Sequence, residues 1–338
     1  MESNKFNGPK AEEPYGELIG ADYSKRIYAK PDPEATNTLH AINEILATQQ
    51  WGGANYALEE ELPFPVFFVF GTPRSGTTLA TQLLCQCLDV AWVDNIAARF
   101  WRAPALGLAV SKSLKSQFQG QVGLESDYGK SADIFGPHEF GYFWQHWLNK
   151  NTVEDFTSVG PLASADLAGL KTCIAQMMHI TKKPMIFKNI MGANHASDIT
   201  HALKKVVWIQ TTRDPLSNAA SIYHARMTYY GRPDVWWSTM PSNYAVIKEQ
   251  TPAQQIVGQI LSLDDQYKAA FVGANNLVQV DYADMCTNPT AVLESIVRIS
   301  MDVLGYEPRR IKDAPSLAPR QPSRNFALFD DIKALIEG

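Results

Sequence analysis

The sequence has few cysteines, no excess of positive charge and no long apolar run, and each absence excludes a class of protein. Lys and Arg number 30 against 35 Asp and Glu, so the net charge of −5 argues against a general nucleic-acid or membrane surface. No stretch approaches the ~18 apolar residues of a spanning helix. The polar first residues lack the charged start and apolar core of a signal peptide. We therefore expect a cytoplasmic protein without a membrane span, whose oligomeric state stays open.

The four cysteines form no metal-binding pattern. Cys85 and Cys87 are too close for a C-x-x-C motif, and both fall in an apolar stretch with a helical pattern. Buried, reduced thiols are the usual state of such residues in a cytoplasmic protein. The sequence therefore predicts no metal site.

The length and the apolar content allow one large domain. The chain has 338 residues, of which 45% are hydrophobic, so a sizeable core can be buried. Residues 1–60 are polar with short helical patches, and we expect an N-terminal extension that packs on the core or on a neighbouring subunit. Residues 61–338 are predicted to form a single α/β domain, with a helical, aromatic-rich insertion at about 90–182 on the substrate side.

Short apolar runs alternate with helical patterns from residue 65 onward. Such runs are typical of strands buried on both faces, and four occur, at residues 66–70, 184–188, 206–212 and 276–282. Pro215, preceded by Asp214 as a cap, suits the first turn of the helix after the third run. The alternation predicts a three-layer α/β sandwich of the P-loop type, with a central, mostly parallel sheet flanked by helices.

The first strand leads into a small-residue loop and then a helix, which is the arrangement of a phosphate-binding loop. Gly71, Gly76 and Thr78 fit the triphosphate pattern G-x-x-x-x-G-K-[ST]. Thr77, however, stands where that pattern has lysine, and Arg74 supplies positive charge instead. Backbone N–H groups and the helix N-terminus can still bind a phosphate. The loop therefore suits a ligand with a single 5′-phosphate better than a triphosphate.

The stretch GTPRSGTTL resembles the 5′-phosphosulfate-binding loop of sulfotransferases that use 3′-phosphoadenosine 5′-phosphosulfate (PAPS). The resemblance is to the bacterial and tyrosylprotein-type branch, in which P-R-S-G-T-T is usual. It implies an α/β sulfotransferase-like domain and donor-binding residues Arg74, Ser75, Gly76, Thr77 and Thr78.

A second stretch, WIQTTRDPLSNAASIY, supports the resemblance. The family grips the 3′-phosphate with an arginine at a strand end and a serine eight residues later, which here are Arg213 and Ser221. Arginine makes a forked, charge-assisted contact to phosphate, and the serine hydroxyl adds a neutral one. Ser217 is a weaker candidate, because its place in the first helical turn already explains it.

Two further stretches match the family more loosely, and a third is a candidate replacement for a family loop that is absent. MIFKNIMGANH is similar to a segment in which a strand ends in a lysine near the sulfuryl group, which implies Lys188. VQVDYADMCTNPTAVLESI is similar to the Y-E-D-L-x-x-[DN]-P element, but Ala283 stands where glutamate is usual, so no function is carried over. The R-K-G loop of the cytosolic branch is absent, and residues 320–326 (RQPSRNF) are its candidate replacement through Arg320 or Arg324.

Sulfuryl transfer should pass through a loose transition state with charge on the equatorial oxygens, by analogy with phosphoryl transfer. Lys188, Arg74 and the hydroxyls of Thr77 and Thr78 are the candidates to stabilise that charge. A sulfuryl group carries less charge than a γ-phosphoryl group, so no metal is expected to be needed. Lys188 ends an apolar strand, which favours the sheet edge where ligands usually bind.

The stretch DIFGPHEFGYFWQHWL supplies the candidate base. Helical spacing predicts a helix from near Pro137, with an aromatic face and a polar stripe that has His138 and Glu139 at its tip. Either residue is a candidate base, and His138 is slightly preferred because its pKa suits neutral pH. An acid in a first helical turn is also favoured by the helix dipole, so a structural role for Glu139 stays open. His224 is the reserve candidate.

The leading hypothesis is metal-independent, in-line transfer of a sulfuryl group from PAPS to a hydroxyl or amine of a small-molecule, lipid or carbohydrate acceptor. A small-molecule kinase on the same scaffold is the first alternative, and Thr77 in place of lysine argues against it. The second is a non-catalytic protein that binds 3′-phosphoadenosine nucleotides. Residues 225–237 are either a lid over the acceptor or a packed surface loop.

Overall fold

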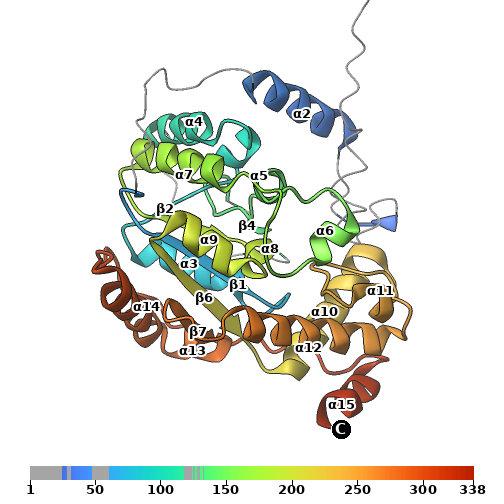
Figure 1. Cartoon of the computed structure of the whole chain (residues 1–338). Coiled ribbons are helices and arrows are strands. Elements are labelled where there is room, and N and C mark those ends of the chain that lie inside the picture. The colour runs from blue at the N-terminus through green and yellow to red at the C-terminus, as the bar shows by residue number, and fades with distance from the viewer. Residues whose placement is uncertain are drawn as a thin grey trace, which may run out of the picture.

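The computed structural model describes residues 25–28, 32–47, 61–117, 124, 126–127, 130–131 and 133–338. Of the N-terminal extension predicted for residues 1–60, most therefore lies outside the described residues. Helix α2 (Pro33–Ala47) runs along the upper edge of the molecule in Figure 1. The fully buried Asn43 ties this helix to the domain, because its amide donates to the Arg99 carbonyl at 2.8 Å and accepts from the Arg102 N–H at 2.9 Å.

A five-stranded, all-parallel sheet forms the centre of the domain, in the order β2-β5-β1-β6-β7. Its strands are β1 (Val66–Gly71), β2 (Ala91–Trp92), β5 (Met185–Lys188), β6 (Val206–Thr212) and β7 (Leu277–Asp281). The four predicted strands are confirmed, and the two-residue strand β2 is the one strand of this sheet that was not predicted. Strand β1 lies between β5 and β6 in parallel register, so all three strands end at one edge of the sheet.

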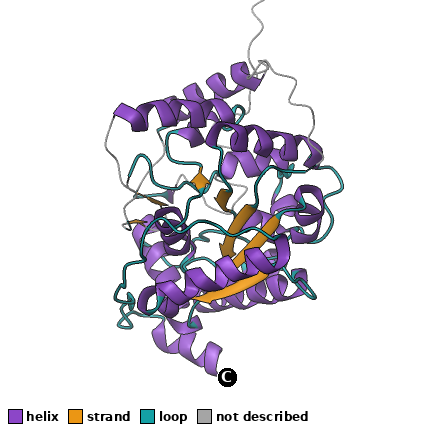
Figure 2. Cartoon of the chain, turned by 90° about the vertical axis from the view of Figure 1, so that its left-hand side faces the viewer, coloured by secondary structure: helices purple, strands orange, loops and turns teal. Residues whose placement is uncertain are grey.

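Helices cover both faces of this sheet, which confirms the three-layer architecture (Figure 2). Side chains of β1 alternate between the faces: Phe68 and Phe70 enter one buried cluster, whereas Phe67 and Val69 enter the other. The first cluster is closed by α5 (Gly141–Trp147), α7 (Leu167–Thr181), α9 (Ala196–Leu203) and α12 (Pro252–Ala270). The second is closed by α3 (Thr77–Cys87) and α14 (Pro289–Leu304). Burial of each such side chain contributes about 1.5–3 kcal/mol.

The remaining elements connect or flank these layers. Between β2 and β5 lie η2 (Ala97–Phe100), α4 (Pro104–Gln117), the hairpin β3 (Ser126–Asp127) and β4 (Lys130–Ser131), and α6 (Val153–Thr157). Further along the chain come α8 (Ile190–Ala193), α10 (Pro215–Tyr230), α11 (Tyr244–Ile247), α13 (Tyr282–Thr287) and α15 (Phe329–Glu337). Asp214 caps α10 as predicted, because its carboxylate accepts the Ser217 N–H at 2.8 Å.

The helix predicted from near Pro137 begins only at Gly141, so this prediction is wrong at its N-terminal end. Pro137 instead forms an isolated bridge with Asp94, and the His138 N–H donates to the Val93 carbonyl at 2.9 Å. Phe140 then takes a left-handed backbone conformation with φ 58°, which starts the helix one residue later. His138 and the following glutamate therefore lie in a loop that is tied to β2.

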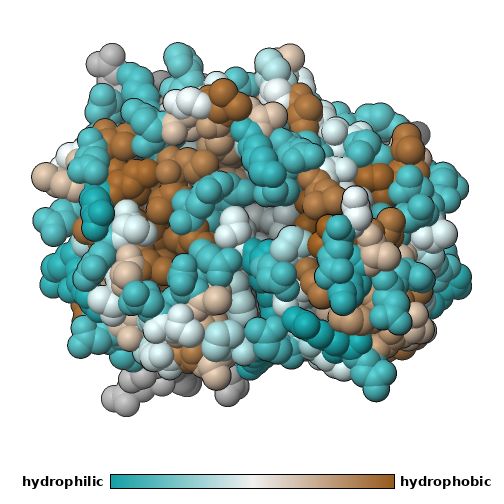
Figure 3. All heavy atoms as spheres, turned by 90° about the horizontal axis from the view of Figure 1, so that it is seen from below, coloured by the Kyte–Doolittle hydropathy of each residue, from teal (hydrophilic) through white to brown (hydrophobic). Residues whose placement is uncertain are grey.

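The face of the molecule seen from below is mixed in hydropathy. On the face seen from below, apolar patches are interrupted by hydrophilic side chains (Figure 3). Exposed apolar residues such as Val272 and Leu261 are normal on a protein surface. Within the described residues, no helix is both long and apolar enough to cross a membrane.

Candidate active site

The two glycines of the phosphate-type loop are required by close backbone contacts. A Cβ atom on Gly71, the last residue of β1, would lie 2.5 Å from the Thr211 carbonyl oxygen. Gly76 has φ 108°, and a Cβ atom there would lie 2.9 Å from the side chains of Tyr282 and Met285. The loop can therefore make its sharp passage from strand to helix only with glycine at both positions.

Three hydrogen bonds fix this loop against its neighbours. The Ser75 hydroxyl is fully buried and lies 2.6 Å from the Thr211 hydroxyl on β6. Asn218 on α10 donates to the Thr72 hydroxyl at 2.8 Å. Arg74 takes φ 69° and its Nε donates to Ser221 Oγ at 3.0 Å. The arginine of the loop is thus directed toward α10, where the second predicted anchor lies.

Arg213 lies beside the same loop, immediately after β6. Its guanidinium donates to the carbonyl oxygens of Arg74 at 3.1 Å and Arg320 at 2.7 Å, and it stacks over the Tyr282 ring at 4.2 Å. Burial lowers the pKa of this guanidinium. Among the residues that the structure describes, Arg213 forms no ion pair with a carboxylate. A half-buried cation whose hydrogen-bond partners are neutral carbonyl groups is a favourable partner for an anion.

The structure therefore brings Arg74, Arg213 and Ser221 into one cluster. Within this cluster, Arg74 donates to Ser221, and Arg213 donates to the backbone carbonyl of Arg74. Residues 320–326 pass beside the cluster through their backbone, since the Arg320 N–H donates to the Tyr282 hydroxyl at 3.0 Å while its side chain is exposed.

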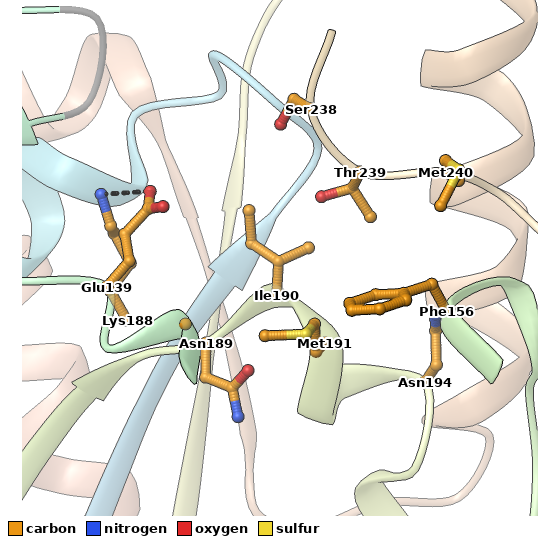
Figure 4. Close-up of a pocket in the computed structure, with 11 residues that line it drawn as sticks. Glu139, Phe156, Lys188, Asn189, Ile190, Met191, Asn194, Ser238, Thr239 and Met240 are labelled. Carbon is orange, nitrogen blue, oxygen red and sulfur yellow. Dashed lines mark ion pairs between the residues drawn. The ribbon is translucent and has the colours of Figure 1, made fainter. Parts of the chain in front are cut away.

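A second group of predicted residues meets at the end of β5. Lys188 is 4% exposed, and its ammonium lies 2.7 Å from Glu139 Oε1 (Figure 4). The same ammonium lies 2.9 Å from Thr78 Oγ1. Thr78 belongs to the first turn of α3, whereas Glu139 belongs to the loop tied to β2. Lysine, hydroxyl and carboxylate thus come together from three separate segments of the chain.

The two histidines considered as bases are placed differently from Glu139. His138 Nδ1 accepts the Phe140 N–H at 2.8 Å, so Nδ1 is engaged by the backbone. His224 lies 3.0 Å from the Ser323 carbonyl, with its ring against Phe326. Neither lines the cavity described next, whereas Glu139 does. Of these three side chains, Glu139 is therefore the one that faces the cavity.

A cavity of about 110 Å³ opens beside this ion pair. Its walls are formed by Glu139, Gly141, Phe156, Lys188, Asn189, Ile190, Met191, Asn194, Ser238, Thr239 and Met240. Residues 225–237, considered either as a lid or as a packed surface loop, do not themselves line it: Val235 and Trp236 are buried, and the lining residues follow directly at 238–240. No motif in the sequence pointed to residues 238–240, whereas Glu139 and Lys188 were predicted as site residues.

Two buried basic side chains support one wall of the cavity. His195 Nδ1 donates to the Gly160 carbonyl at 2.6 Å, and Lys150 Nζ donates to His195 Nε2 at 2.7 Å. Lys150 also donates to the Asp155 carbonyl and to Ser158 Oγ, both at 2.7 Å. Burial lowers the pKa of His195 to about 4 and that of Lys150 to about 8, so the imidazole is neutral at neutral pH. This network holds the segment that carries Phe156 in the wall.

A profile of the Sulfotransferase family matches residues 65–300, so the chain belongs to that family. The family implies PAPS as the sulfuryl donor. The fold is similar to the crystal structure of sulfotransferase STF1 from Mycobacterium tuberculosis H37Rv, with a TM-score of 0.50 and 15% identity over 87% of this chain and 84% of that chain. Sulfotransferase STF9 from Mycobacterium avium is also similar, with a TM-score of 0.45 and 15% identity over 79% and 70% of the two chains. No curated protein sequence matches significantly. At these identities the structural similarity shows the fold alone.

Proposed function

We propose that this protein transfers the sulfuryl group of PAPS to a hydroxyl group of a small acceptor bound in the cavity beside Glu139. The observation that carries the proposal is the placement of Lys188. Its ammonium contacts Thr78 of the phosphate-type loop on one side and Glu139 of the cavity on the other. A single cation thus joins the proposed donor site to the proposed acceptor site.

The residues present fit a nucleotide with two separate anionic ends. Helix α3 begins at Thr77 without a side-chain cap, so its positive dipole end and first-turn N–H groups favour an anion. We assign the 5′-phosphosulfate to this loop, residues 74–78. The cluster of Arg74, Arg213 and Ser221 would hold the 3′-phosphate, because two guanidiniums and a hydroxyl match its charge and its oxygen acceptors.

PAPS supplies an activated sulfuryl group: the acceptor oxygen–sulfur bond forms as the sulfur–oxygen bond to the 5′-phosphate breaks, and 3′-phosphoadenosine 5′-phosphate (PAP) leaves. Glu139 accepts the hydroxyl proton of the acceptor, as general-base catalysis requires. Lys188 and Thr78 supply positive charge and a hydroxyl donor where the loop and the cavity meet, so that developing negative charge is stabilised there. The buried setting of Lys188 strengthens this interaction relative to water.

Calorimetric titration tests the donor half of the proposal. PAP is expected to bind with equal affinity with and without a magnesium chelator, and to bind more tightly than magnesium–ATP. Tighter binding of magnesium–ATP would contradict the proposal and favour a kinase. Transfer of label from sulfur-labelled PAPS to an organic alcohol tests the chemical half, and binding without transfer to any hydroxyl compound would identify a non-catalytic nucleotide-binding protein.

A further inference from the structure

We infer that the acceptor is a short, uncharged aliphatic alcohol, whose hydroxyl lies at the Glu139–Lys188 end of the cavity and whose carbon chain runs toward Met240 and Phe156. This inference rests on the proposed sulfuryl transfer and narrows the class of acceptor. It depends on four properties of the cavity: the distribution of charge, the apolar far end, the volume and the support behind the walls.

Charge is confined to one end of the cavity. Figure 4 shows Glu139 and Lys188 together on one side, with Ile190 and Met191 in the middle and Phe156 and Met240 on the opposite side. The other polar lining side chains, Asn189, Asn194, Ser238 and Thr239, are neutral. A tail that carries a carboxylate or phosphate would find no cation at the far end, so charged acceptors are disfavoured.

The apolar end selects against a sugar. Phe156 and Met240 are both buried, at 8% and 2% exposure, and they pack in one apolar cluster with Trp236 and Ile247. A hexose would bring several hydroxyl groups into the cavity, and those that face Phe156 and Met240 would lack hydrogen-bond partners. A methylene chain loses no hydrogen bonds there and gains contact with the flexible methionine side chains.

The volume selects against an aromatic ring. The cavity has a volume of about 110 Å³ and is open to solvent on one side. A cavity of about 150 Å³ is known to hold one benzene ring. The space at hand is smaller, so it accommodates a few linked carbon atoms, whereas a phenol ring would have to project from the open side or separate the walls.

Hydrogen bonds behind the walls resist that separation. Gln259 is fully buried on α12, and its amide donates to the carbonyl oxygens of Trp237 at 3.0 Å and Thr239 at 2.7 Å. On the other wall, Lys150 and His195 hold the segment around Phe156. Both walls are therefore fixed by buried polar contacts, which preserve a narrow shape.

A matched acceptor panel tests the inference with sulfur-labelled PAPS and the full chain. We expect kcat/KM for n-butanol and n-hexanol to exceed that for phenol and for glucose by about tenfold or more, since one methylene of misfit in an apolar pocket is worth about that factor. Faster transfer to phenol or glucose, or transfer to none of the four compounds while PAP still binds, would overturn the aliphatic assignment. PAP titration separates this failure from failure of the proposed function, because absence of PAP binding would overturn both.

Enlarging the apolar end tests the same assignment from the side of the protein. Met240→Ala is expected to raise the phenol-to-hexanol ratio of kcat/KM about tenfold with unchanged PAP affinity. Met191→Ala, at a less buried position of the same wall, should shift the ratio in the same direction if the first variant fails to fold. Met301→Ala, on the exposed face of α14, is the control that should leave the ratio unchanged. An unchanged ratio in both cavity variants would contradict the placement of the carbon chain.

Discussion

Lys188 and Glu139 form an ion pair of 2.7 Å in which the ammonium is buried and the carboxylate is half exposed, at 4% and 52% side-chain exposure. The exposed carboxylate faces the cavity, whereas the buried ammonium also contacts Thr78 of the phosphate-type loop. This division gives each partner a distinct role, because the carboxylate can meet an incoming hydroxyl while the lysine stays at the loop.

Glu139→Gln is expected to lower kcat by about a hundredfold to ten-thousandfold, since it removes the proton acceptor and keeps the shape. PAP affinity should change little, which calorimetry would show. His138→Ala is the comparison, and it should cost less than tenfold because its Nδ1 is occupied by the Phe140 N–H. A larger loss in His138→Ala than in Glu139→Gln would assign the base to the histidine.

Lys188→Met is expected to lower kcat by about a hundredfold to a thousandfold, because it removes the donor nearest to the developing charge. Single-turnover kinetics with labelled PAPS would measure the chemical step directly. Lys248→Met, at an exposed position, is the matched control. Equal rates in the Lys188 variant and the control would show that the ion pair is structural only.

Arg213→Met is expected to weaken PAP binding about tenfold to a hundredfold, the range for a lost hydrogen bond to a charged group. Adenosine 5′-phosphosulfate, which has no 3′-phosphate, should bind both forms of the protein almost equally. Arg298→Met on the exposed face of α14 controls for loss of net charge. If Arg213→Met weakens the binding of both nucleotides to the same extent, Arg213 does not contact the 3′-phosphate.

Stability is expected to fall as the pH drops from about 6.5 to about 4, because burial lowers the pKa of His195 to about 4 from 6.5. In this window the unfolded chain binds a proton that the folded protein does not, so unfolding becomes easier, by up to about 3 kcal/mol. Urea unfolding at a series of pH values would measure the slope. His195→Gln should flatten it, whereas the exposed His201→Gln should not. A wild-type slope in the His195 variant would contradict this origin.

The sheet was readable from the sequence because its strands are short apolar runs buried on both faces. Residues 66–70 and 206–212 are such runs, and they stand between segments with helical patterns. The glycines of the loop could also be predicted from their pattern. The structure shows why they are needed, because the backbone passes too close to Thr211 and Tyr282 for any side chain. Local pattern and local geometry agree at these positions.

Contacts between segments that are far apart in the sequence could not be predicted from it. Helical spacing placed Glu139 in a helix, but pairing of Pro137 with Asp94 and the left-handed Phe140 delayed the start of α5. His195 gave no signal, because its role depends on Lys150 and Gly160, which only the folded chain brings near. The same holds for the approach of Arg74 to Ser221.

The measurement that tests the central claim most directly is a mass balance of sulfur-labelled PAPS turnover in the presence of an aliphatic alcohol and a magnesium chelator. The account predicts one labelled sulfate ester for each PAP released, with the yield lost in Lys188→Met. Release of PAP with all label in free sulfate, or turnover that requires added magnesium, would contradict it.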